Sequence, residues 1–119
     1  MAGTSGETSL EAFDVVVVPF PFTDRKADKR RPALVLSTGA FNQAARHSVM
    51  AMITSAEQSS WPGDSGIGNL PAAGLSTPCI ARLKLFTLDH RLIIRVCGRL
   101  SAPDQKRLRA AWKGVLAAP

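Results

Sequence analysis

The stretch Asp14-Val-Val-Val-Val-Pro-Phe-Pro-Phe-Thr-Asp24 decides the fold. Its four consecutive valines are β-branched and favour extended backbone, and an unbroken apolar run is typical of a buried strand. We expect this strand over residues 13–19, because Pro19 and Pro21 lack the backbone N–H that a continuing strand needs for pairing. The chain is therefore predicted to leave the sheet after residue 19.

Hydrophobic patterning predicts four more strands further along the chain. They lie at residues 32–37, 47–54, 79–85 and 91–100. Residues 39–46 permit one short helix, and residues 87–90 are predicted to form a turn. Residues 55–78 are rich in glycine and proline, so we expect a long loop that holds at most a short strand or turn.

The C-terminal segment carries the signals of a helix. Ser101 is a good N-cap, Pro103 suits the first turn, and Asp104 makes a variant of the capping box. The apolar residues that follow share one stripe of the helix, namely Leu108, Trp112, Val115 and Leu116. Five or more short strands with one terminal helix predict a mostly β (α+β) fold, either a small barrel or a strongly bent sheet packed by that helix.

Length and charge limit the possible classes of protein. A chain of 119 residues is one domain, which we place at 13–119 after a flexible N-terminal arm at 1–12. The net charge of +6 arises wholly from residues 61–119, since acidic and basic groups balance in residues 1–60. This excess indicates either a polyanionic partner or a basic face kept for solubility. No apolar run approaches a membrane span, and the first residues do not resemble a signal peptide, so we expect a cytoplasmic protein.

The cysteines and histidines do not suggest a metal centre. Cys79 and Cys97 are far apart in apolar runs, and we expect inert buried thiols without a disulfide. Two cysteines and two histidines without close spacing are a weak zinc-ligand set. His47 and His90 have pKa values suited to a general base, but one opens a predicted strand and the other lies in a predicted turn.

Five short motifs, taken in order, resemble the MazF/PemK family of toxins. They are Asp14–Asp24, Lys29–Ser37, Ala51–Ser55, Ala81–Asp89 and Leu92–Ser101. With the terminal helix they extend over residues 13–116, and their common order makes the resemblance specific. The sequence departs from the family at Phe13, where the family usually has glycine.

The resemblance implies a bent, SH3-like β barrel with short helices that works as a homodimer. It implies a type II toxin that cleaves single-stranded RNA without a metal ion or cofactor and is neutralised by a cognate, acidic antitoxin protein. An alternative is a non-catalytic toxin of the same fold that binds a protein target such as DNA gyrase. Such toxins use an exposed apolar C-terminus with a tryptophan, whereas Trp112 here lies within the predicted helix.

Two residues match the family's catalytic positions. Arg31 matches its catalytic arginine, and the planar guanidinium suits phosphate oxygens. Thr54 matches a threonine whose hydroxyl donates to phosphate, and Ser55 has the same chemistry. Asp24 or Asp28 is expected to support catalysis or to shape the loop. The alternative is a surface arginine paired with one of these aspartates, and a threonine that satisfies the backbone.

Five further residues are predicted to contact RNA, namely Lys29, Arg30, Trp61, Arg82 and Lys84. Lys29 and Arg30 lie beside the catalytic position, and Trp61 is flanked by loop residues that would expose its ring to an unpaired base. Arg82 matches an arginine that one branch of the family pairs with an aspartate two residues later. That position is Lys84 here, so the pair is expected to be missing, which leaves Arg82 as a phosphate contact or a dimer-interface residue.

Overall fold

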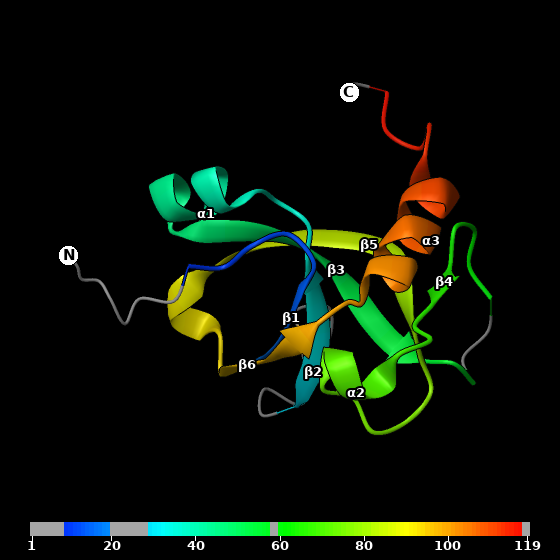
Figure 1. The fold of residues 1–119 in the computed structure, drawn as a ribbon. Helices are drawn as coiled ribbons and strands as arrows, with labels where there is room; N and C mark the ends of the chain where they lie inside the picture. The colour runs from blue at the N-terminus through cyan, green and yellow to red at the C-terminus, as the bar shows by residue number, and fades with distance from the viewer. Residues whose placement is uncertain (1–8, 20–28, 58–59, 118–119) are drawn as a thin grey trace.

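Six strands form one antiparallel sheet in the computed structural model, which describes residues 9–19, 29–57 and 60–117. The strands are β1 (Asp14–Pro19), β2 (Arg30–Val35), β3 (His47–Ser55), β4 (Ser65–Gly66), β5 (Cys79–Asp89) and β6 (Arg95–Arg99). Their spatial order is β4-β5-β3-β2-β1-β6, and the sheet curls into a half barrel (Figure 1). The predicted mostly β architecture is confirmed.

Three short helices complete the fold: α1 (Gly39–Ala45), α2 (Leu70–Ala73) and α3 (Ala102–Trp112). Thr38 caps the start of α1 by accepting from the backbone N–H of Phe41, and Arg46 ends the helix in the left-handed conformation. Ser101 caps α3 as predicted, because its side chain accepts from the backbone N–H of Asp104. The capping box is only half formed, since the Asp104 carboxylate binds elsewhere.

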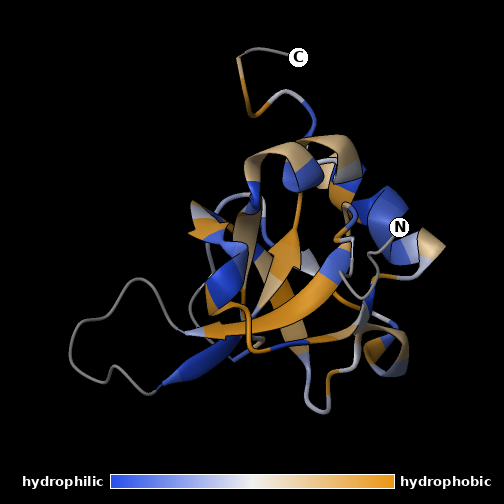
Figure 2. Ribbon diagram, turned by 90° about the vertical axis from the view of Figure 1, so that its left-hand side faces the viewer, coloured by the Kyte–Doolittle hydropathy of each residue, from blue (hydrophilic) through white to orange (hydrophobic). Residues whose placement is uncertain are grey.

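The valine run of β1 is buried on both faces of the sheet. Val15 belongs to the core between the sheet and helices α2 and α3, together with Leu34 and Leu108. Val16 and Val18 point the other way, into a second core. A strand covered on both faces must be apolar at every position, which explains the unbroken run. Figure 2 shows the hydrophobic colouring concentrated along the central strands.

Strand β2 begins at Arg30, two residues before the predicted start at Pro32. It pairs with β1 from its first residue, whereas its pairing with β3 begins only at Ala33. Pro32 has no backbone N–H to donate, so it lies where the β3 ladder has not yet started. Pairing with β1 therefore makes β2 begin two residues earlier than the sequence pattern predicts.

Strand β5 is longer than predicted because it continues to Asp89, through most of the segment 87–90 that was predicted to form a turn. Its last residue, Asp89, lies opposite His47 at the start of β3. The partner strand thus sets the length of β5. The chain turns afterwards, in a 3₁₀ helix at His90–Leu92.

Two further expectations need correction. The loop at 55–78 holds the short strand that was expected, but also helix α2, whose Ala73 is buried in the core. Helix α3 ends at Trp112, so Val115 and Leu116 are exposed and do not extend the apolar stripe. Lys113, the C-cap, leaves the helical conformation, and a turn follows in which the Val115 N–H donates to the Trp112 carbonyl at 3.2 Å.

The described part of the predicted N-terminal arm begins at residue 9. Leu10 is buried in the second core, and its carbonyl accepts from the Asn42 side chain at 2.9 Å. Residues 1–8 lie outside the described part of the chain, so the flexible arm stays a prediction. None of the helices described here is long and apolar enough to cross a membrane.

Candidate functional site

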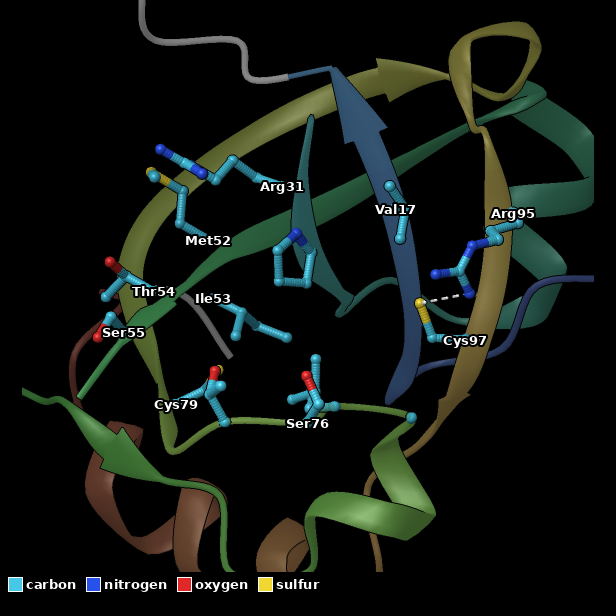
Figure 3. Close-up of a pocket in the computed structure, with 14 residues that line it drawn as sticks. Val17, Arg31, Met52, Ile53, Thr54, Ser55, Ser76, Cys79, Arg95 and Cys97 are labelled. Carbon is cyan, nitrogen blue, oxygen red and sulfur yellow. Dashed lines mark hydrogen bonds between the residues drawn. The ribbon is translucent and has the colours of Figure 1, made fainter. Parts of the chain in front are cut away.

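A cavity of about 580 Å³ opens at the end of the sheet where β1, β2, β3 and β6 approach the segment at residues 74–77 (Figure 3). Strand side chains and this segment contribute all of its lining. The lining residues are Val17, Arg31, Pro32, Met52, Ile53, Thr54, Ser55, Gly74, Leu75, Ser76, Thr77, Cys79, Arg95 and Cys97. Hydroxyl, thiol and guanidinium groups thus line the cavity together with apolar side chains.

The two predicted catalytic residues lie on adjacent strands at the rim of this cavity. Ala33 of β2 lies opposite Met52 of β3, and Arg31 and Thr54 each lie two residues beyond this pair on the same strands, so that both share its face. Residues opposite each other in an antiparallel pair point to the same face. In Figure 3, Arg31, Met52 and Thr54 extend to the same side of the sheet. The sheet therefore brings a guanidinium and a hydroxyl together.

Ser55 also lines the cavity, as its predicted supporting role requires. Its side-chain oxygen accepts from the backbone N–H of Glu57 at 3.2 Å, which fixes the hydroxyl at the end of β3. Lys29 and Arg30 are exposed beside Arg31 but do not line the cavity. Asp24 and Asp28 lie outside the described residues.

The opposite wall holds a cation that the sequence analysis missed. Arg95 of β6 lines the cavity, and its Nη1 donates to Cys97 Sγ at 3.6 Å. Figure 3 shows these two side chains across the cavity from Arg31. The only sequence signal for this placement is that Arg95 and Cys97 are two residues apart, which puts both on one face of a strand.

Ser76 and Thr77 add two hydroxyls between α2 and β5. Both are exposed and sit in a Gly- and Pro-rich segment that the sequence indicated only as a loop. Because a loop of this kind has no periodic pattern, its approach to β6 was not predictable from residue spacing.

The cysteines are partly exposed rather than buried, which corrects the prediction. Cys79 and Cys97 are both free thiols, and both line the cavity. Partial burial raises the pKa of Cys79, so its thiolate is disfavoured. The two thiols are partly exposed because both face the cavity instead of being enclosed in the core.

The family-type pair between Arg82 and an aspartate two residues later is absent, as expected, because that residue is Lys84. Arg82 instead pairs with an aspartate from a different segment. Arg82 Nε donates to Asp64 Oδ1 at 3.0 Å, and its Nη2 donates to Oδ2 at 2.9 Å. The arginine side chain is only 9% exposed. Hydrogen bonding to Arg82 holds the pKa of Asp64 below its usual value, so the carboxylate stays charged. This pair was not predicted, because Asp64 lies 18 residues before Arg82 in the chain and in a different segment.

Trp61 is exposed as predicted, with 41% of its surface accessible. The ammonium of Lys84 lies 4.6 Å from the centre of its ring, and the guanidinium carbon of Arg82 lies 5.9 Å from it. These are cation–π contacts. Three of the predicted RNA-contact residues therefore gather on β5 and the turn before β4.

The histidines have structural contacts away from the cavity. His47 Nδ1 lies 3.0 Å from the backbone oxygen of Ala45, and His90 Nε2 lies 2.7 Å from Ser48 Oγ. Burial lowers the pKa of His90. Neither ring lines the cavity, so the strand-opening and turn interpretations fit their positions.

Within residues 9–19, 29–57 and 60–117, no group of three or more His, Cys, Asp or Glu side chains is arranged to hold a metal ion. The prediction of metal-independent chemistry stays a prediction. Chemically, the cavity offers guanidinium and hydroxyl donors to an anion such as a phosphodiester.

Comparison with known proteins gives a consistent result. The family described as "PemK-like, MazF-like toxin of type II toxin-antitoxin system" matches residues 11–116. A MazE–MazF structure from Deinococcus radiodurans is similar with a TM-score of 0.71 and 20% identity, covering 93% of this chain and 98% of that chain.

Two mycobacterial structures are also similar. An endoribonuclease in complex with its cognate antitoxin from a mycobacterial species has a TM-score of 0.70 and 15% identity, covering 93% of this chain and 96% of that chain. The Mycobacterium tuberculosis toxin MazF-mt6 has a TM-score of 0.65 and 19% identity, covering 82% and 90%. At these identities the likeness concerns the fold. The comparison with curated proteins found no match.

Proposed function

The chain belongs to the PemK-like, MazF-like toxin family of type II toxin–antitoxin systems, and we propose that its cavity cleaves single-stranded RNA without a metal ion. The observation that supports this most directly is that Arg31 and Thr54, from two adjacent strands, both line the same cavity. Guanidinium and hydroxyl groups at one point are what binding and cleaving a phosphodiester require.

The proposed reaction uses the ribose 2′-OH as the internal nucleophile. Its oxygen attacks the adjacent phosphorus, the bond to the 5′-oxygen breaks, and the products are a 2′,3′-cyclic phosphate and a 5′-OH end. The 2′-OH loses its proton and the departing 5′-oxygen gains one, so one proton is removed and one supplied. No external water or oxidant enters this step.

Arg31 would clamp the phosphate and stabilise the charge that grows on its oxygens. A guanidinium has five N–H donors and no acceptor, so Arg31 would serve as a clamp and as a donor to the leaving oxygen rather than as a base. Thr54 and Ser55 would donate hydrogen bonds to non-bridging oxygens. Removing one such donor costs on the order of 10²–10³ in rate. Asp24 and Asp28 remain proposed supporting residues.

Lys29, Arg30, Trp61 and Lys84 are the proposed RNA contacts around the cavity, because each has an exposed or partly exposed side chain. Arg82 is placed behind Trp61 and contributes to RNA binding through that ring. We also propose a homodimer, an acidic cognate antitoxin as protein partner, and action in the cytoplasm, where messenger RNA is available. Sedimentation of the purified chain tests the first of these.

The alternative function, a toxin that binds a protein target, depended on an exposed tryptophan near the C-terminus. Trp112 instead packs on the core and donates its indole N–H to the carbonyl of Gly63 at 2.6 Å. This contact favours the ribonuclease over the protein-binding alternative.

A cleavage assay tests the proposed function. Purified protein is incubated with a long single-stranded RNA in EDTA, and new ends are mapped and tested for a 5′-OH. We expect cuts that disappear with Arg31→Ala and decline about 10²–10³-fold with Thr54→Ala. Arg91→Ala is the matched control, because Arg91 is exposed and pairs with Asp89 away from the cavity. Intact RNA with the wild-type chain would contradict the proposal.

A further inference from the structure

We infer that Asp64 is a positioning residue that holds Trp61 as a preformed stacking platform for an unpaired nucleobase next to the cavity. The inference rests on the proposed function, that this site binds single-stranded RNA. Trp61 was expected to stack from its sequence context, but Asp64 carries no motif and was not among the predicted site residues. The structure links the two residues directly.

Asp64 closes a tight turn that begins at Trp61. The backbone N–H of Trp61 donates to Asp64 Oδ2 at 3.0 Å, and the backbone N–H of Asp64 donates to the Trp61 carbonyl at 3.0 Å. The carboxylate thus fixes the backbone from which the indole projects. An exposed indole with an ordered backbone loses little conformational entropy when a base stacks on it.

The same carboxylate anchors this turn to the sheet. Both oxygens of Asp64 accept from Arg82, whose guanidinium is almost wholly buried on β5. The turn has a second anchor, because Trp112 of α3 donates to the carbonyl of Gly63. Asp64 also neutralises Arg82, and the pair therefore presents little net charge to a phosphate beside the ring.

The platform lies close to the proposed reaction point. Arg82 is opposite Met52 on β3, and Thr54 is two residues further along the same strand. Diagonal neighbours of this kind on one face are about 7–8 Å apart. A nucleotide adjacent to the one held at Thr54 is therefore in position to meet Trp61.

Lys84 gives the platform a way to bind base and phosphate together. Its ammonium lies over the ring in the free protein, 4.6 Å from the centre. The lysine stem is flexible, so an arriving base takes the place over the ring and the ammonium pairs with the adjoining phosphate. When a base stacks on Trp61, the cation–π contact between Lys84 and the ring is lost, and a charge-assisted contact between Lys84 and the phosphate is gained.

The first experiment measures binding alone. Trp112 is retained because it anchors the turn, so the Trp61 signal is taken as the fluorescence difference between each chain and the same chain carrying Trp61→Phe. A short oligodeoxyuridylate serves as probe because it lacks the 2′-OH nucleophile. We expect the oligonucleotide to quench Trp61 fluorescence. Asp64→Asn should weaken binding about tenfold and reduce the quenching, since one stacked base is worth about 1–3 kcal/mol.

Two sets of variants keep the test decisive. Trp61→Ala should bind the probe about tenfold more weakly, as measured by the anisotropy of a labelled probe. Trp61→Phe should retain most of the affinity. Combining Trp61→Ala with Asp64→Asn should add no further loss, because both remove one platform. Asp89→Asn is the matched control, because Asp89 likewise binds an arginine side chain and a backbone N–H, but away from the cavity.

Kinetics separate positioning from a general loss of structure. If the wild-type chain cleaves RNA, Asp64→Asn should raise KM about tenfold with kcat unchanged. Normal affinity in Trp61→Ala would overturn the platform, even if Asp64→Asn failed to fold. Wild-type quenching unaltered by Asp64→Asn would overturn the positioning role. Failure of the proposed function differs from both, since the wild type would then bind the probe with Asp64-dependent quenching yet leave RNA intact.

Discussion

Phe13 shows how one side chain accommodates a position where the family usually has glycine. Its φ is 77°, in the left-handed region that glycine adopts freely and that costs other residues free energy. Three interactions hold it there. Its N–H donates to the carbonyl of Val35 at 2.6 Å, its carbonyl accepts from Leu100, and Arg109 lies 4.8 Å from its ring centre. The departure noted in the sequence is thus compensated locally, at the entry to β1.

Gly74 is required for the close approach of α2 to β6. Its φ is +74°, and a Cβ built there would lie 2.3 Å from the carbonyl oxygen of Cys97. Gly74→Ala should therefore lower the free energy of unfolding by about 3 kcal/mol, from backbone strain and overpacking together. Urea denaturation followed by far-UV circular dichroism measures the change.

Gly66→Ala is the matched control for that substitution. Gly66 lies in short strand β4, and a Cβ there meets nothing within 4 Å. The free energy of unfolding of the Gly66→Ala variant should stay close to that of the wild type. A loss at Gly74 no larger than at Gly66 would mean that α2 can move away from β6 without cost, and that the cavity wall is not fixed by this contact.

At the scale of elements, Asp104 joins α3 to the segment that leads into α2. The carboxylate is 2% exposed and accepts from the backbone N–H groups of Gly68 and Asn69, both at 2.9 Å. Burial alone would raise the pKa of Asp104. The hydrogen bonds from Asn69, Gly68 and Ser101 and the charge of Arg107 together outweigh burial, so the pKa lies below its usual value.

Asp104→Ala should lower the free energy of unfolding at neutral pH by about 2–3 kcal/mol, because two charge-assisted hydrogen bonds are lost. The folded pKa lies below the unfolded value of 3.8, so the unfolded chain binds more protons between the two values. The stabilisation is therefore complete above pH 3.8 and disappears as pH falls through the folded pKa. Urea unfolding of wild type and variant at about pH 7 and at lower pH measures this.

The difference between wild type and Asp104→Ala should thus shrink in acid. A difference of equal size at both pH values would show that the loss comes from packing and not from the carboxylate. Asp89→Ala provides the comparison, since the Asp89 pair with Arg91 is screened by water and its removal should change stability little.

The elements that the sequence predicted well are those fixed by local pattern. The valine run of β1 and the Ser101 cap of α3 are local signals, and both are confirmed. The errors occur where a partner strand determines how far a strand extends. Asp89, for example, stays in the sheet because it pairs with His47 of β3. Short α2 was missed because its four residues are too few for a helical period to be visible.

The same distinction applies to the candidate site. Arg31 and Thr54 were predicted from the family motifs, and the pairing of β2 with β3 brings both residues to the cavity. Asp64 and Arg82 come together from a loop and a strand, and only the closed turn at Trp61 brings them into contact. Arg95 reaches the cavity through the order β1-β6 of the sheet, which residue spacing does not reveal.

Over the whole molecule, most of the excess charge lies outside the cavity, to whose lining residues 61–119 contribute Arg95 as their one basic residue. The net charge of +6 comes from residues 61–119, whereas the proposed catalytic Arg31 lies in the neutral half of the chain. Helix α3 carries several of these cations but contributes no residue to the cavity lining. Two of them have contacts within the protein, since Arg107 pairs with Asp104 and Arg109 lies over the Phe13 ring.

Lys106 and Lys113 are therefore the cleaner test of whether the basic face gathers RNA, because both are exposed at α3. If they contact phosphates, the combined variant Lys106→Glu, Lys113→Glu should weaken binding of the deoxyuridylate probe. The slope of log affinity against log salt should flatten by about 1.4, at about 0.7 for each lost contact with a single strand. The turnover number should not change, because α3 supplies no group to the cavity. Lys106→Arg with Lys113→Arg keeps both charges and should keep the slope, whereas an unchanged slope in the reversed variant would assign this face to solubility.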